Sequence, residues 1–284
     1  MLPLDPTQPL FTWPNARACA ERCALAYDET DRSVQERGIN ARVVTNAATD
    51  TEALVVNEGD CISVAFRGSC CLCDWIQDFK ARPEHPRKGL TWSDSYEVEA
   101  EVHEGFFEDV ESISAELILA IRNIGGSGNS PLRPIFLTGH SKGAAEATLF
   151  ALELQRQIGM AGAGDLPRGA FALCGVYLFG CPRVGNRAFA NIYNETLFEE
   201  TFRVVNENDI VPRVPGVLMG YRHCGQEIFL PVGGGCCENP SLGFKLLNDA
   251  LGLWSAYRRE KFAALDVLVA DHALGAYQKR IQFL

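Results

Sequence analysis

Short apolar runs and stretches with helical spacing alternate along this chain. The apolar runs that predict strands are 41–45, 52–57, 61–66, 134–137, 171–179 and 202–205, with one more inside 221–230. The stretches that predict helices are Asn15 to about Tyr27, 107–124, 144–158 and 186–198, followed by two near the C-terminus that part at Asp271-His272. Alternating strands and helices predict an α/β fold with a mostly parallel sheet.

Several details refine this outline. The 171–179 run is continuously apolar, as expected for a central strand with helices on both faces. Asn15 is a residue type that caps helices, and Glu58-Gly59-Asp60 predicts a hairpin turn. The polar, Pro-containing stretch 80–97 predicts a surface excursion, and the acids within 94–111 predict a solvated negative face.

We expect the 284 residues to form a single domain with a Pro-rich arm at 1–14, because no linker divides the chain. A hydrophobic content of 47% allows a substantial core. The formal charge of −10 argues against nucleic acid or an anionic membrane surface as the main partner. The longest nearly unbroken apolar run, 171–181, is too short to span a bilayer. Residues 1–6 lack a basic and hydrophobic leader, so a cytoplasmic location is expected.

Eleven cysteines are a high and odd number. We expect them to be reduced and buried, acting as small hydrophobic residues. Disulfides in a protein exported by another route are the first alternative. A zinc site is the second: it would combine Cys70 and Cys73 with Cys224 and either Cys236 or Cys237, although this second half lacks C-x-x-C spacing.

The pattern G-x-S-x-G occurs at Gly139-His140-Ser141-Lys142-Gly143, after a short apolar run and before a predicted helix. Glycines on both sides of Ser141 allow a sharp strand-to-helix turn that exposes the serine Oγ. The alternative is a Gly-rich turn that only packs a helix. A serine in the first kind of turn predicts a nucleophile, which needs a base, an acid and an oxyanion hole.

Five histidines are candidates for the base. His272 is preferred because it lies between two predicted helices near the C-terminus, where a loop can bring it over the nucleophile, and because it follows the acid in chain order. His103 precedes the nucleophile, His140 adjoins it and should point away from Oγ, and His85 lies in the polar excursion. His223 alternates within a strand-like run, which is typical of a structural histidine.

Asp209 is the preferred acid, because it follows the strand 202–205 in a loop that can aim a side chain across the sheet. Glu207 is the nearest rival, and ordinary turn chemistry is the alternative for both. For the oxyanion hole, one backbone N–H should come from Lys142, directly after the serine. The second should come from Ser69, in the loop after the third predicted strand.

Several blocks in a fixed order resemble the fungal-type class 3 lipases, over roughly residues 41–280. These blocks are 64–69, 74–78, 102–106, 139–143, 179–186, 208–212 and 271–272. The resemblance implies an α/β-hydrolase fold in which a short lid covers the site. It also implies the triad Ser141, Asp209 and His272, with Ser69 and Lys142 as oxyanion donors, and the predicted reaction requires no metal or organic cofactor.

The chain departs from the family pattern in two places. Lys142 stands where many members have Leu, and we expect its ammonium either to be solvated or to favour anionic head groups. The lid segment, Cys70 to Trp75, is Cys-rich. Trp75 is interpreted as the apolar anchor of the lid or, alternatively, as a core aromatic.

The predicted function is the hydrolysis of acylglycerols or related acyl esters by a serine carboxylic ester hydrolase. A phospholipase or a feruloyl-type esterase on the same scaffold is the alternative within this class, because fold and triad do not set specificity. A catalytically silent, lipase-like scaffold that binds partners is the alternative from another class. The expected partner is a lipid or other acyl ester, with transient contact to a lipid interface, and the chain is assumed to be a monomer.

Overall fold

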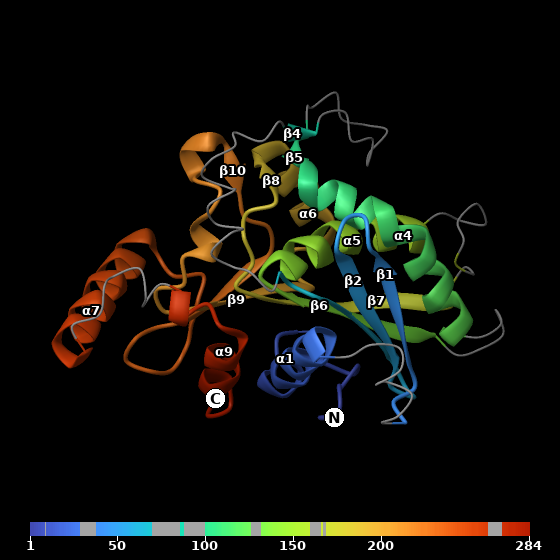
Figure 1. Ribbon diagram of the computed structural model, residues 1–284, viewed down its shortest axis with the longest axis horizontal. Coiled ribbons are helices and arrows are strands. Elements are labelled where there is room, and N and C mark those ends of the chain that lie inside the picture. The colour runs from blue at the N-terminus through green and yellow to red at the C-terminus, as the bar shows by residue number, and fades with distance from the viewer. Residues whose placement is uncertain are drawn as a thin grey trace.

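The computed structural model describes residues 1–8, 10–28, 38–69, 86–87, 100–125, 132–159, 166, 169–260 and 269–284. Its centre is an eight-stranded sheet (Figure 1). In sheet order the strands are β1 (Ala41–Asn46), β2 (Thr51–Asn57), β3 (Ile62–Phe66), β6 (Arg133–His140), β7 (Phe171–Phe179), β9 (Thr201–Asn206), β11 (Gln226–Leu230) and β12 (Cys237–Glu238). The five strands from β3 to β11 run parallel, whereas β1, β2 and β12 pair antiparallel.

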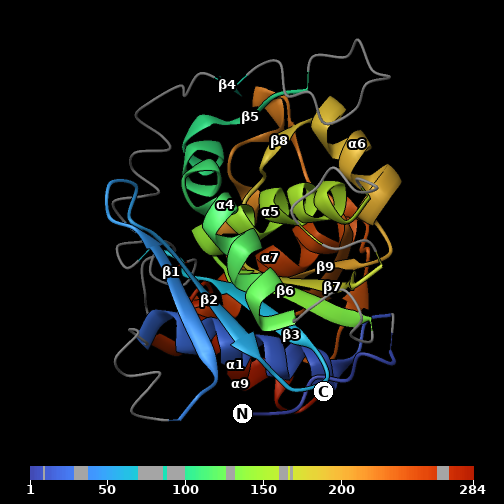
Figure 2. The same ribbon diagram turned by 90° about the vertical axis from the view of Figure 1, so that its right-hand side faces the viewer.

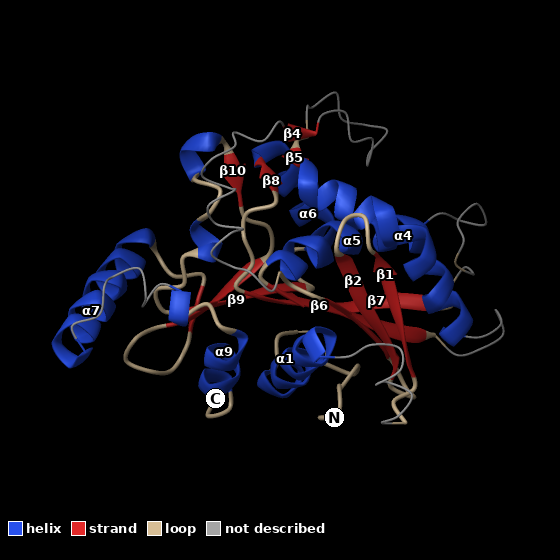
Figure 3. Ribbon diagram, in the orientation of Figure 1, coloured by secondary structure: helices blue, strands red, loops and turns tan. Residues whose placement is uncertain are grey.

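Helices cover both faces of this sheet (Figure 3). The helices on one face are α4 (Glu104–Gly125), α5 (Lys142–Gly159) and α6 (Arg187–Leu197). The opposite face carries α1 (Trp13–Asp28) and α9 (Leu274–Ile281), and both chain ends lie on this side (Figures 1 and 2). Helix α7 (Leu242–Glu260) lies at one end of the molecule.

Smaller elements lie beyond the α4 and α5 face. A second sheet has the strand order β10 (Tyr221–Arg222), β8 (Gly185–Asn186), β5 (Val102–His103) and β4 (Pro86–Arg87). Two short 3₁₀ turns are η1 (Val211–Arg213) and η2 (Val217–Met219). None of the helices within the described ranges combines the length and apolar composition needed to cross a bilayer.

The central strands are apolar at successive positions because each face packs against a different group of helices. On β6, Ile135 and Leu137 join the core under α4 and α5, whereas Phe136 joins the core under α1 and α9. On β7, Val176 belongs to the first core and Tyr177 to the second. Side chains alternate across a strand, so a strand between two helical layers must be apolar throughout. The predicted central strand at 171–179 is confirmed.

The predicted strands and helices are confirmed where they lie within the described residues, as is the hairpin between β2 and β3. The surface excursion predicted at 80–97 lies outside the described residues except for 86–87. Asn15 does not cap the first helix as expected. Helix α1 begins at Trp13, and the Thr12 hydroxyl accepts a hydrogen bond from the Asn15 backbone N–H at 3.3 Å. The Asn15 side chain instead binds the backbone of Asp5: its oxygen accepts from the Asp5 N–H at 2.8 Å and its NH₂ donates to the Asp5 carbonyl at 3.0 Å. It therefore fastens the N-terminal segment to the helix.

Strand β6 is longer than the predicted 134–137 and ends at His140. The polar residues after Leu137 gave no strand signal, yet Gly139 pairs with Phe66 of β3 and His140 pairs with Phe179 of β7. Hydrogen bonding on both sides extends the strand where side-chain pattern alone would end it. Ser141 therefore follows the strand directly, and α5 begins at the next residue.

Eight cysteines within the described residues are free thiols: Cys19, Cys23, Cys61, Cys174, Cys181, Cys224, Cys236 and Cys237. Burial raises the pKa of Cys23 and Cys61 to about 12, which favours the neutral thiol. For the zinc alternative, Cys224 is buried whereas Cys236 is exposed, and Cys70 and Cys73 lie outside the described residues.

Candidate active site

Ser141 occupies the turn between β6 and α5 with a backbone φ of 60°. This left-handed conformation is uncommon for a residue with a Cβ and is a source of backbone strain. The turn is held by two backbone hydrogen bonds: the Ser141 N–H donates to the Phe179 carbonyl at 2.9 Å, and the Ala144 N–H donates to the Ser141 carbonyl at 3.0 Å. A strained serine between a strand and a helix has the geometry expected of a nucleophile elbow.

The loop after β3 lies directly against this turn. A Cβ on Gly143 would overlap the carbonyl oxygen of Phe66, and a Cβ on Gly68 would overlap the Tyr27 hydroxyl and the His140 carbonyl. Glycine is required at both positions because the two backbones approach so closely. Ser69, which follows Gly68, therefore lies on a segment packed against the elbow.

Asp209 and His272 are brought into contact from distant parts of the chain. His272 Nδ1 lies 2.9 and 2.8 Å from the two carboxylate oxygens of Asp209. His272 Nε2 is buried and has no hydrogen-bond partner among the described residues. Ser141, Asp209 and His272 are 2%, 0% and 2% exposed. A carboxylate on Nδ1 fixes the ring with its lone pair on Nε2, the protonation state required of a general base.

The Asp209 carboxylate accepts hydrogen bonds from two further groups. The Tyr277 hydroxyl, on α9, donates to Oδ2 at 2.5 Å, and the Val211 backbone N–H donates to Oδ1 at 2.8 Å. Burial, with the nearby Asp209 charge, raises the pKa of Tyr277 well above its ordinary value, so the phenol keeps its proton. These donors fix the orientation of the carboxylate that binds the imidazole.

His140 connects the elbow to His272. The two rings stack with centroids 4.6 Å apart, and His140 Nε2 lies 2.8 Å from the His272 carbonyl oxygen. A carbonyl only accepts, so Nε2 carries the proton and Nδ1 accepts from the Tyr27 hydroxyl at 2.9 Å. Burial lowers the pKa of His140 to about 3, which keeps it neutral. Both of these hydrogen bonds join His140 to residues other than Ser141.

The rival candidates make other contacts. His223 Nε2 donates to the Pro212 carbonyl at 2.7 Å, and burial lowers its pKa well below the ordinary value. His103 Nδ1 accepts from the Phe106 N–H at 3.4 Å. Glu207 pairs with Arg280. His85 lies outside the described residues.

Neither expectation for Lys142 is correct. Its side chain is 12% exposed, and Nζ lies 3.1 Å from Asp109 Oδ2 and 3.3 Å from Glu146 Oε1. The ammonium is therefore paired within the protein and is neither solvated nor presented to a head group. The solvated negative face predicted within 94–111 is wrong for Asp109, which is buried, although Glu108 and Glu111 are exposed.

Sequence reasoning missed Tyr277, Tyr27, Asp109 and Glu146. Each is a residue type with an ordinary structural explanation, a core tyrosine or a helix-surface acid, so no local signal distinguished it. The lid from Cys70 to Trp75, including Trp75, lies outside the described residues. Within the described ranges, no group of three or more histidine, cysteine or acidic side chains is arranged to hold a metal ion.

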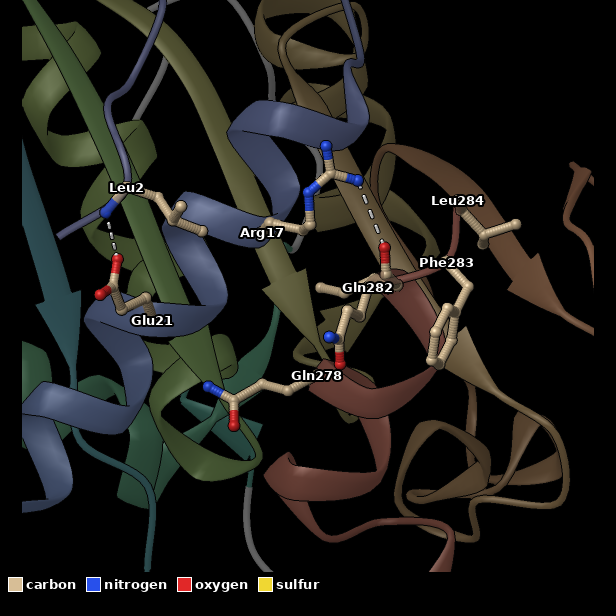
Figure 4. Close-up of a pocket in the computed structure, with 8 residues that line it drawn as sticks. Leu2, Arg17, Glu21, Gln278, Gln282, Phe283 and Leu284 are labelled. Atoms are coloured by element: carbon tan, nitrogen blue, oxygen red, sulfur yellow. Dashed lines mark hydrogen bonds between the residues drawn. The ribbon is translucent and has the colours of Figure 1, made fainter.

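A pocket of 720 Å³ lies elsewhere, between α1 and the C-terminal residues (Figure 4). In this pocket, the Arg17 guanidinium donates a hydrogen bond to the Ile281 carbonyl at 3.4 Å. The Leu2 backbone N–H donates one to the Glu21 carboxylate at 2.5 Å. The residues that line it are Leu2, Arg17, Glu21, Gln278, Ile281, Gln282, Phe283 and Leu284. They include no histidine, serine or cysteine, so the groups that line this pocket do not form a base and nucleophile for acyl transfer.

The family described as Lipase (class 3) matches residues 63–219, which is more than half of the chain and includes Ser69, Ser141 and Asp209. The chain belongs to the class 3 lipase family. The lipase of Rhizomucor miehei is 33% identical over 186 residues, covering 64% of this chain and 45% of that protein. The secreted mono- and diacylglycerol lipase 1 of Fusarium solani is 33% identical over 172 residues, covering 61% and 44%. The chain thus spans about half the length of these curated relatives.

A solved structure, described as a triacylglycerol lipase whose catalytic centre is a serine protease triad, is 26% identical. It superimposes with a TM-score of 0.53 over 76% of this chain and 77% of its own. The expected α/β-hydrolase fold and the family resemblance are confirmed. The expected cytoplasmic location finds no support, because a relative is named as secreted.

Proposed function

We propose that this chain is a serine carboxylic ester hydrolase that cleaves acylglycerols or related acyl esters, with Ser141, Asp209 and His272 as its triad. The main support for the proposal is the hydrogen bonding of His272 Nδ1 to both carboxylate oxygens of Asp209. His272 Nε2 has no hydrogen-bond partner among the described residues. The stacking of His272 on the residue before Ser141, and the strained φ of Ser141, support it. The triad of the solved triacylglycerol lipase supports it by relationship.

In the first half of the reaction, Ser141 Oγ attacks the ester carbonyl carbon while His272 Nε2 accepts the hydroxyl proton. Asp209 stabilises the imidazolium that forms. The carbonyl oxygen becomes an oxyanion, which the backbone N–H groups of Ser69 and Lys142 bind. Each such donor typically contributes about 3 kcal/mol of transition-state stabilisation. The imidazolium then protonates the departing alcohol as its bond to the acyl carbon breaks.

In the second half, a water molecule attacks the acyl-enzyme carbonyl while His272 Nε2 accepts one of its protons. The oxyanion forms again at the same two N–H groups. Collapse of this intermediate releases the carboxylic acid, and Nε2 returns the proton to Ser141 Oγ. This acyl transfer needs only the protein groups and water.

The test is covalent labelling with a fluorophosphonate probe, combined with hydrolysis of a nitrophenyl ester series that varies in acyl length. We expect the label on the peptide that contains Ser141, and loss of both labelling and hydrolysis in Ser141→Ala. Ser114→Ala is the matched control, because Ser114 Oγ only donates to the Val110 carbonyl, at 2.7 Å on α4. Labelling at another residue would contradict the assignment.

The same assay separates substrate classes when a phospholipid and a feruloyl ester are included. We expect acylglycerol and simple acyl esters to be hydrolysed with the higher kcat/KM. Preferential cleavage of the phospholipid or of the feruloyl ester would assign the chain to that alternative. A parent protein that is inert on every ester and does not react with the probe would favour a silent binding scaffold.

A further inference from the structure

The nucleophile elbow carries a buried cluster of charges that the triad does not use. It consists of Lys142, the residue after the serine, together with Asp109 on α4 and Glu146 one turn along α5. Lys142 Nζ lies 3.1 Å from Asp109 Oδ2 and 3.3 Å from Glu146 Oε1. The exposed fractions of the three side chains are 12%, 13% and 0%. We call this set the elbow cluster.

A lysine at this position is unfavourable without its partners. The first turn of a helix carries a partial positive charge that repels a cation, and burial removes the solvation of the ammonium. Burial lowers the pKa of Lys142, but the carboxylates of Glu146 and Asp109 outweigh it and the net pKa is raised. The lysine therefore stays charged, held between two helices by opposite charge.

The elbow cluster also reaches the loop that carries Ser69. Lys142 Nζ lies 3.5 Å from the backbone carbonyl of Asp50, in the turn between β1 and β2. The Asp50 carboxylate pairs with Arg67 at 2.7 Å, and the Arg67 N–H donates to the Glu52 carbonyl at 2.9 Å. The two segments with the proposed oxyanion donors are thus tied to the same turn.

We propose that the Lys142 ammonium, clamped by Asp109 and Glu146 and tied through Asp50 to Arg67, is a positioning group that holds the two oxyanion-hole segments in register. The inference rests on the proposed function, because it assigns Lys142 a side-chain role in addition to its backbone N–H. Asp109 and Glu146 fix the first turn of α5, which carries one donor. Asp50 and Arg67 fix the loop that carries the other.

The charge of the elbow cluster depends on pH. The groups that face Glu146 are Lys142 on its own helix and Asp109 on α4, and the charged groups next to Lys142 on its far side are Asp50 and Arg67. Burial raises the pKa of Glu146 to about 8, Lys142 opposing and Asp109 reinforcing the shift. With Glu146 protonated, the elbow cluster is neutral. With Glu146 ionised, it carries one negative charge beside the oxyanion site.

A negative charge there disfavours the oxyanion, so kcat should fall as the pH rises through the Glu146 transition. A unit charge that lies close to the oxyanion in a partly buried site changes the rate of the chemical step by about tenfold. We expect the kcat of the parent to fall about tenfold between about pH 7 and pH 9.5, and the kcat of Glu146→Gln to vary by less than about twofold over this range. An unchanged alkaline fall in Glu146→Gln, or no fall in the parent, overturns the proposal.

Glu153→Gln is the matched control on the same helix. Glu153 pairs with Arg156 at 2.7 Å, and this pair is more exposed than the elbow cluster. We expect this variant to keep the alkaline fall of the parent. A profile flattened equally in both variants would show that the elbow cluster has no specific role.

Lys142→Met tests the clamp itself, because methionine keeps an unbranched stem and removes the charge. We expect kcat to fall about tenfold or more with KM within about twofold, since oxyanion contacts form in the transition state. We also expect faster backbone hydrogen exchange at 66–69 and 142–146, with α9 unchanged. Equal kcat and unchanged exchange contradict the proposal.

The exchange measurement separates this proposal from the proposed function, because it requires no turnover. An inert parent that does not react with the fluorophosphonate probe would contradict the proposed function alone. In such a parent, faster exchange in Lys142→Met would still support the clamp, and unchanged exchange would refute it. If Lys142→Met does not fold, the pH profile of Glu146→Gln decides the question.

Discussion

Two carboxylates beside the nucleophile elbow are equally inaccessible to solvent, yet their surroundings differ. Asp209 and Glu146 are both 0% exposed. Three donors, from His272, Tyr277 and Val211, converge on Asp209. Neither oxygen of Glu146 has a hydrogen bond from a described residue, and its ion pair with Lys142 spans 3.3 Å.

The difference shows that burial alone does not define the role of a buried acid. Hydrogen bonds from fixed donors hold a carboxylate in one orientation, as the proposed partner of His272 requires. Burial with few donors penalises the charged form, as the raised pKa of Glu146 records. In the roles proposed here, Asp209 orients a proton-transfer group and Glu146 adjusts the charge near the oxyanion site.

The largest effect should come from Asp209→Asn. The NH₂ group of the new amide can donate to His272 Nδ1, which would place the imidazole proton on Nε2, the wrong tautomer for a general base. In a serine protease this substitution lowers kcat by about 10⁴-fold, and we expect a fall of about 10³-fold or more here. The measurement is steady-state hydrolysis of a short nitrophenyl ester. Glu207→Gln, at the rival acid, should change kcat by less than about threefold, and a larger fall there than at Asp209 would refute the assignment.

Tyr277→Phe should have a smaller effect on the same network. It removes the hydroxyl that donates to Asp209 and accepts from the Asn206 N–H at 3.2 Å. We expect kcat to fall about tenfold and the free energy of unfolding to fall by about 1–2 kcal/mol. Tyr193→Phe, which removes a buried hydroxyl bonded to Thr201 at 2.9 Å, should lower stability similarly without changing kcat. Equal kcat losses in both variants would indicate a general packing effect.

Glu146→Gln should increase stability at alkaline pH. The pKa of Glu146 is about 8 in the folded protein, whereas the ordinary value of a glutamate, expected in the unfolded chain, is 4.5. The stability of the parent therefore falls as the pH rises from the lower to the higher value. The amide does not titrate, and Lys142 keeps Asp109 as its partner. We expect the variant to unfold with a free energy at least about 2 kcal/mol higher than the parent near pH 9, and equal to it within about 0.5 kcal/mol near pH 4. Urea denaturation at both pH values measures the difference, and a variant less stable at alkaline pH would contradict it.

The smallest effect should come from Glu153→Gln. Its pair with Arg156 joins side chains that are 22% and 39% exposed. Solvent screens such pairs, so we expect a change in unfolding free energy below about 0.5 kcal/mol, independent of pH between about 6 and 9. A change as large as that of Glu146→Gln would remove the contrast between the buried and the exposed acid.

Patterns along the chain predicted the element types because strand and helix periods are local properties. The apolar run at 171–179 and the turn signature around Ser141 needed no partner to be recognised. Boundaries were less predictable. Thr138 and Gly139 belong to β6 because they pair with both β3 and β7, and His140 belongs to it because it pairs with β7. A single segment of sequence cannot reveal this pairing.

Only part of the candidate site could be predicted, because contacts between distant segments leave no local pattern in the sequence. Chain order and loop position selected Asp209 and His272, which the structure brings within 2.8 Å. The donor from Tyr277 and the burial of Lys142 depend on where α9 and α4 pack. The sequence contains no signal for either, because both contacts join segments that are far apart in the chain or on different helices.

The sequence by itself determined the order of strands and helices, the strained serine turn and the membership in the class 3 lipase family. Only the tertiary structure decided which groups the side chains of Lys142, Glu146 and Tyr277 contact and whether their polar atoms are exposed to water. Periodicity specifies which face of an element is apolar, whereas the pairing of buried polar groups depends on how separate elements dock.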